Sequence, residues 1–181
     1  LLVTATFIDY DLYIIPDQIT VPGMIVGISM ATAFPQIRPT PSTATTPWEG
    51  FLVGLAGLLV GGGLTQGGRV LGTLALRREA MGFGDVTLMA MIGSFLGWQA
   101  AVLTFFLAPF FGLTHATIKL ISYVGKRLSG IPAGSADREI PFGPYLSMAA
   151  LALLVSWPWV WAHWGADTFR SIRMLFSPVG P

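Results

Sequence analysis

Long stretches without a charged side chain restrict what this chain can fold into. No aspartate, glutamate, lysine or arginine occurs between Asp85 and Lys119. Only 10% of the 181 residues are charged and 53% are hydrophobic, whereas an ordinary soluble domain is about 25% charged. A helix needs roughly 20 predominantly apolar residues to cross a bilayer. The sequence therefore predicts an all-α fold, a polytopic transmembrane helical bundle.

The apolar runs divide the chain into about six membrane helices. Their expected ranges are Leu1–Ile8, Ile15–Phe34, Glu49–Leu76, Val86–Trp98, Ala100–Tyr123 and Ile140–Trp164. Because the chain begins inside an apolar run, we expect the first helix to be truncated and an N-terminal part to be missing. The whole range 1–181 is expected to form one membrane-embedded domain, with loops at 35–48 and 124–139.

The distribution of basic residues predicts the orientation. The loops at 77–79 and 124–139 contain Arg77, Arg78, Lys126, Arg127 and Arg138, and the other side contains Arg38, Arg170 and Arg173. Basic residues favour the cytoplasmic side of a membrane. This places the loop at 124–139 in the cytoplasm and the loop at 35–48 on the opposite side. The turn at 9–17, the start of the Asp85 helix and the start of the last helix should then converge on the cytoplasmic face.

Composition excludes several functions. The chain has no cysteine, so disulfides, thiol catalysis and cysteine-bound metals are excluded. The two histidines, His115 and His163, are far apart on apolar segments, which favours hydrogen-bonded or interfacial side chains over metal ligands. A net charge of +1 gives no basic field for nucleic acid. No cofactor or metal is expected.

Glycines crowd the expected helix at 49–76. Small residues spaced four apart let helix backbones approach closely in lipid. We expect these glycines to serve packing, and the alternative is a hinge or a substrate groove.

Two carboxylates, Asp9 and Asp85, each lie where an apolar run meets a loop. Ionisable groups at such places are costly and indicate a functional site. Two carboxylates held close in a low dielectric share one proton, so that one can accept a proton from water while the other polarises a carbonyl. Gly82 and Gly84 are expected to let the backbone bend beside Asp85 and to let an extended substrate approach. An ion or proton site, or a helix cap at Asp85, remains open on the residues alone.

Three sequence blocks resemble those of type IV prepilin peptidases, bacterial membrane aspartyl proteases with a GxGD motif. The blocks are Ile8-Asp9-Tyr10-Asp11 with Ile15-Pro16-Asp17-Gln18, Gly82-Phe83-Gly84-Asp85 with the following apolar run, and Ile140-Pro141-Phe142-Gly143-Pro144-Tyr145. They stand in the family's order and at similar separations.

This resemblance implies an aspartic endopeptidase of the inner membrane with its site facing the cytoplasm. Asp9 and Asp85 would be the catalytic pair, and Asp11 is the main rival to Asp9. Asp11, Asp17, Gly82 and Gly84 would support the site or contact substrate. The implied partners are the bilayer and the prepilins or pseudopilins whose basic leader such enzymes remove.

Two departures from the family pattern stand out. Thr87 occupies a position where the family usually has lysine, and nothing in the chain matches the cysteine-rich methyltransferase region of many members. The competing hypotheses are another GxGD intramembrane protease, which lacks support because no Pro-Ala-Leu motif occurs, and a non-enzymatic proton-coupled transporter or scaffold.

Overall fold

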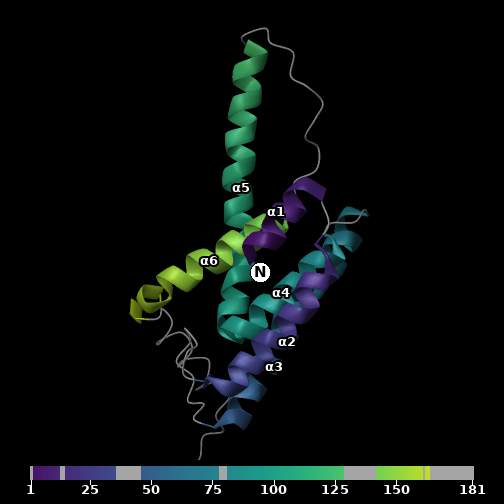
Figure 1. Cartoon of the computed structure of the whole chain (residues 1–181). Helices are drawn as coiled ribbons and strands as arrows, with labels where there is room; N and C mark the ends of the chain where they lie inside the picture. Colours follow the sequence, from purple (N-terminus) through teal and green to yellow (C-terminus); the bar gives the residue numbers. More distant parts are fainter. Residues whose placement is uncertain are drawn as a thin grey trace, which may run out of the picture.

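The computed structural model describes residues 2–12, 15–35, 46–77, 81–128, 142–160 and 162–163. These residues form six main helices (Figure 1), listed here in chain order: α1 (Leu2–Leu12), α2 (Asp17–Ala33), α3 (Pro47–Leu76), α4 (Phe83–Leu96), α5 (Trp98–Leu128) and α6 (Gly143–Val160). No strand occurs in these ranges. The predicted all-α bundle is confirmed.

Among the described residues, three helices are long and apolar enough to cross a membrane, over Pro47–Ala75, Trp98–Lys119 and Gly143–Val160. The expected membrane helices therefore divide into helices that are long enough to cross a membrane and shorter ones. With 17 residues, α2 falls just short of a typical span, and α4 is an apolar helix of only 14 residues. At 1.5 Å per residue, α4 extends only about 20 Å, and most of its residues are buried within the bundle.

Local sequence fixes several helix ends. Thr46 and Glu49 form a capping box at the start of α3, in which each side chain accepts a hydrogen bond from the other residue's backbone N–H. Gly97 alone connects α4 to α5, with φ 87° and ψ 169°, a conformation accessible essentially only to glycine. The break expected between the helices at 86–98 and 100–123 thus falls at Gly97.

Some boundaries differ from the expected ones. The fourth helix begins at Phe83, so Asp85 lies inside its first turn and not before it. The fifth helix continues through Leu128, five residues into the loop expected at 124–139. The rest of that loop, and 36–45 of the loop expected at 35–48, lie outside the described residues.

Glycines bring α3 into backbone contact with its neighbours. Gly57 of α3 lies directly against Gly93 of α4, so that a side chain on either would overlap the other's carbonyl group. A Cβ on Gly61 would lie 2.5 Å from the Met89 carbonyl oxygen. These contacts support the packing interpretation of the glycine-rich helix.

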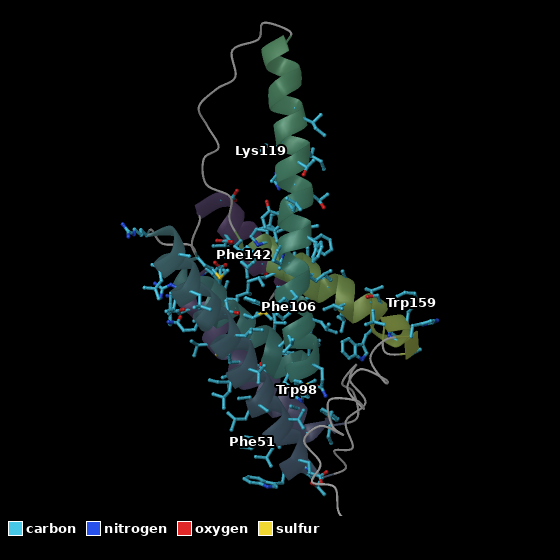
Figure 2. All side chains as sticks on the ribbon, turned by 180° about the vertical axis from the view of Figure 1, so that it is seen from behind. Phe51, Trp98, Phe106, Lys119, Phe142 and Trp159 are labelled. Carbon is cyan, nitrogen blue, oxygen red and sulfur yellow. The ribbon has the colours of Figure 1, made fainter. Side chains whose placement is uncertain are left out.

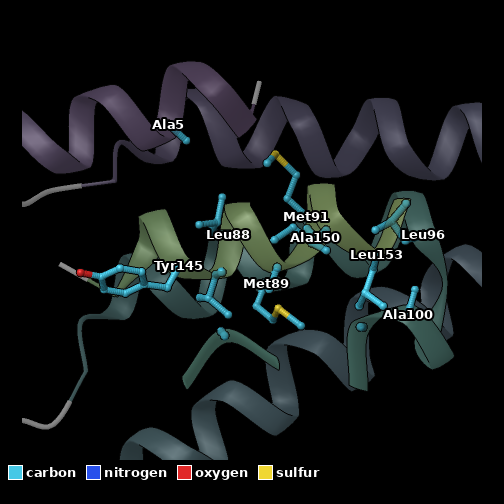
Figure 3. Close-up of a cluster of buried hydrophobic side chains, with 14 of the residues drawn as sticks. Ala5, Leu88, Met89, Met91, Leu96, Ala100, Tyr145, Ala150 and Leu153 are labelled. Carbon is cyan, nitrogen blue, oxygen red and sulfur yellow. The ribbon is translucent and has the colours of Figure 1, made fainter. Parts of the chain in front are cut away.

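The core is centred on α4 and α6. Figure 3 shows Leu88, Met89 and Met91 of α4 facing Ala150 and Leu153 of α6. All five side chains are buried. The first helix joins this core through Ala5 and packs on α6. The C-terminal part of α5, which carries Lys119, extends well beyond the other helices (Figure 2).

Candidate active site

The end of α1 and the start of α4 bring two carboxyl groups together. Asp9 is 6% exposed and Asp85 is 7% exposed, although both are charged residue types. Asp85 occupies the first turn of α4. The two groups are close enough that the charge of Asp9 acts on Asp85. No ion pair is formed by either carboxyl group within the described ranges. Buried carboxyl groups are rare in folded proteins, so this pair marks the candidate site.

The start of α6 completes the site. A Cβ on Gly143 would lie 3.2 Å from Asp9 Cγ and 2.9 Å from Ile15 Cδ1. A Cβ on Gly84 would lie 2.9 Å from Ile15 Cβ. Ile15 therefore fills the space between the first turns of α4 and α6, beside Asp9. These contacts bring together the three helix ends that were expected to converge, and the cytoplasmic position of this convergence stays a prediction.

Burial dominates the electrostatics of the pair, which lies outside the three candidate membrane spans. Desolvation raises the pKa of Asp85 to about 7, the negative charge of Asp9 adds to this rise, and the Gly82 backbone N–H opposes it. Desolvation also raises the pKa of Asp9, and the Gly143 backbone N–H opposes that rise. Oδ2 of Asp9 is buried and has no hydrogen-bond partner within the described residues. The pair is therefore arranged to hold a proton near neutral pH.

The other predicted acidic residues lie apart from this pair. Asp11 and Asp17 are exposed on either side of the turn between α1 and α2. Of the two candidates for the first carboxylate, Asp9 is the one whose side chain is buried beside Asp85. The Thr87 hydroxyl donates to the Gly84 carbonyl oxygen at 3.0 Å, so this position supplies no charge to the pair.

The predicted glycine-dependent bend beside Asp85 does not occur, while the predicted approach of a substrate to these glycines stays a prediction. Gly82 has φ −70° and ψ 156°, an extended conformation that any residue adopts, so no glycine-dependent bend occurs there. Gly84 lies within α4 and is needed because Ile15 approaches so closely. The two glycines thus have different roles: Gly84 is a packing position and Gly82 is an exposed helix cap.

We expect the two glycines to respond differently to the same change. Gly84→Ala should displace Ile15 and disturb the approach of α4 to α6. This overpacking should lower the free energy of unfolding by roughly 1–3 kcal/mol, which is measured as a lower melting temperature in detergent. Gly82→Ala should have little effect, since its Cβ would lie 3.7 Å from the nearest atom, Asp85 Oδ2. Equal losses in the two variants would contradict the assigned packing role.

One residue near the site escaped the sequence-based prediction. Arg69 donates through Nε to the Met81 carbonyl oxygen at 3.1 Å and so ties α3 to the segment before Asp85. The available signal was that Arg69 is the only charged residue between Glu49 and Arg77 in an otherwise apolar helix. A lone charge in such a helix marks a functional or structural polar contact.

An apolar cavity of about 480 Å³ opens at the opposite end of α4 from Asp85. Its lining comes from α1, α2, α4 and α6 and contains no titratable residue. The cavity therefore offers no acid–base chemistry of its own. In the described part of the chain, no group of three or more His, Asp or Glu side chains is arranged to hold a metal ion.

The fold and the site together define a class: a membrane helical bundle with two buried carboxyl groups at converging helix ends. Comparison with known families identifies which one. The model of the type IV leader peptidase family matches residues 1–117, a range that contains both Asp9 and Asp85. The chain belongs to this family.

Curated relatives agree with the family match. The chain is 29% identical to a prepilin leader peptidase/N-methyltransferase of Pseudomonas putida over 97% of this chain and 51% of the relative. It is 32% identical to a protein of the same name from Stutzerimonas stutzeri, over 84% of this chain and 50% of the relative. The chain thus spans about half the length of these relatives. No solved structure matches it.

Proposed function

We propose that this chain is a membrane aspartic endopeptidase that uses Asp9 and Asp85 to hydrolyse a peptide bond. The observation that carries the proposal is the burial of these two carboxyl groups together, inside the range matched by a leader peptidase family. Aspartic proteolysis needs two carboxyl groups that share one proton. A purely capping role for Asp85 would not require a second buried carboxyl group facing it.

The two environments suggest separate roles. Asp85, with its pKa near 7, holds the shared proton, and Asp9, which faces the Gly143 N–H, is the ionised partner. Asp9 takes a proton from water as the water oxygen bonds to the scissile carbonyl carbon, and Asp85 gives its proton to the carbonyl oxygen. Asp9 then passes its proton to the departing amine as the C–N bond breaks, and Asp85 takes a proton back from one hydroxyl of the tetrahedral intermediate as the carbonyl group forms again.

The proposed substrate is a prepilin or pseudopilin with a basic leader, cleaved at the cytoplasmic face of the bacterial inner membrane. The exposed carboxylates Asp11 and Asp17 on either side of the α1–α2 turn would attract such a leader. The apolar helices would leave the apolar part of the substrate in the bilayer. A methyltransferase activity is not proposed for these residues.

Substitution of neighbouring aspartates tests the proposal. Purified Asp9→Asn protein should lose cleavage of a model prepilin in detergent by about 10²–10⁴-fold, because the base that activates water is removed. Asp11→Asn, two residues along the same helix, is the matched control. Since Asp11 is exposed, this variant should keep its kcat and show at most a higher KM for a basic leader.

The outcomes separate the hypotheses. Full cleavage by Asp9→Asn would refute the pair, and an inactive Asp11→Asn beside an active Asp9→Asn would move the first carboxylate by two residues. Proton transport by the wild-type protein in liposomes, without any peptidase activity, would favour the transporter hypothesis.

A further inference from the structure

A tyrosine and a histidine join α5 to the start of α6. The Tyr145 hydroxyl and His115 Nδ1 are 2.6 Å apart, and the two rings meet edge to face with centroids 5.7 Å apart. Tyr145 is 5% exposed, while His115 is exposed. Figure 3 shows the Tyr145 hydroxyl pointing away from the apolar core cluster. The hydroxyl thus reaches past the core to a polar partner on the neighbouring helix.

This contact lies in the turn that faces Asp9. Gly143, two residues before Tyr145, opens α6. A Cβ on Gly143 would lie 3.2 Å from Asp9 Cγ, so the first turn of α6 lies against the Asp9 carboxyl group, and the Gly143 backbone N–H lowers the pKa of Asp9. The first N–H groups of a helix have no partner within the helix, so this N–H is free to serve Asp9. The Phe142 carbonyl oxygen accepts from the N–H groups of Tyr145 and Leu146, which closes the first turn. Tyr145 and Gly143 therefore move together.

We propose that the His115–Tyr145 hydrogen bond fixes the first turn of α6 so that the Gly143 N–H stays on Asp9. This makes His115 and Tyr145 positioning residues of the site, and the inference rests on the proposed peptidase function. The reason is mechanical: helix ends fray more readily than helix centres. Packing of Leu146, Ala149 and Ala150 holds α6 further along. At the first turn, Ile15 packs against Gly143, and the hydrogen bond to His115 adds a polar contact with α5.

A purely structural role for the pair predicts different behaviour. If the hydrogen bond only satisfies a buried hydroxyl, its loss lowers stability without altering how Asp9 titrates. If it positions Gly143, its loss weakens the interaction that favours ionised Asp9, and the pKa of Asp9 rises further. The acid limb of the pH–rate profile, which reports the group that must be ionised, then moves to higher pH.

Four variants of the full chain test the proposal. Tyr145→Phe keeps the ring and removes the hydroxyl. His115→Asn places an amide atom where Nδ1 was, whereas His115→Gln places it where Nε2 was and removes the contact of Nδ1 with the Tyr145 hydroxyl. Gly112→Ala is the packing control, since its Cβ would meet the Tyr145 ring at an ordinary 3.5 Å.

The kinetic readout is the pH dependence of model prepilin cleavage. Tyr145→Phe and His115→Gln should move the acid limb up by about half a pH unit and lower kcat on that limb roughly threefold, with KM unchanged. His115→Asn and Gly112→Ala should match the wild type. Agreement between His115→Asn and the wild type would also show that the limb is not the titration of His115. The Tyr145→Phe/His115→Gln double variant should be no worse than either single variant.

A second readout is independent of peptidase activity. Hydrogen exchange at residues 142–147 should be several-fold faster in Tyr145→Phe and His115→Gln than in the wild type. Faster exchange with an unmoved acid limb would overturn the positioning role, and unchanged exchange would overturn the proposed tie itself. If the wild-type protein cleaves no prepilin, the proposed function fails, and the exchange measurement still decides whether the tie fixes this turn.

Discussion

Asp85→Asn should abolish peptidase activity and at the same time make the protein more stable at neutral pH. Loss of the group that donates the proton to the carbonyl oxygen should lower kcat by about 10³-fold. Stability should rise because the native state keeps Asp85 buried beside Asp9. Asparagine has nearly the same shape and carries no charge to desolvate.

The size of the stabilisation should depend on pH in a defined direction. The pKa of Asp85 is about 7 in the folded protein and 3.8 in an unfolded chain, so the folded state holds the proton more tightly. Wild-type stability therefore falls as pH rises from about 4 to about 7 and is then constant. The melting temperature of Asp85→Asn should equal that of the wild type near pH 4 and exceed it by about 5 °C at pH 8.

Thermal unfolding in detergent at several pH values would measure this difference. Asp17→Asn is the control, because Asp17 is exposed and also lies in the first turn of a helix. That variant should not gain stability as pH rises. A melting temperature of Asp85→Asn that is lower than the wild type at pH 8 would show that the Asp85 carboxylate stabilises the fold, as a helix cap would.

The same Gly→Ala change should have opposite effects at two positions of α3. Gly57→Ala should destabilise the bundle by several kcal/mol, because its Cβ would overlap the Gly93 carbonyl group and force the backbones of α3 and α4 apart. Gly63→Ala should stabilise it by up to about 1 kcal/mol, because no atom lies within 4 Å of the added Cβ and alanine favours helix.

Melting temperature and hydrogen exchange in α4 would report both changes. Gly57→Ala should speed up amide exchange along the whole of α4, whereas Gly63→Ala should leave the α4 amides protected. Equal destabilisation by both substitutions would mean that flexibility of the glycine-rich helix, and not close packing, is what the glycines supply.

The sequence was most informative about features set by local chemistry. Charge-free runs predicted the helices, and the junctions of apolar runs with loops pointed to Asp9 and Asp85, both of which are buried in the structure. These features depend on residues close together in the chain, whose preferences survive in any compact fold.

Contacts between distant segments were not predictable. The sequence could not choose between Asp9 and Asp11, since a rotation of one helix end decides which of them is buried. The close approach of Ile15 to Gly84 was not predictable either, because it arises only once the segment before α2 packs on α4. The Tyr145–His115 contact joins residues 30 apart on two helices, and neither helix alone indicates it.

The two carboxyl groups of the proposed pair belong to helices joined through a third. The first helix packs on α6, and α6 packs on α4. The distance between the Asp9 and Asp85 carboxyl groups therefore depends on the position of α6 between the two helices. Substitutions in α6 can therefore change the pKa at which the pair loses its shared proton, even when both aspartates stay unchanged.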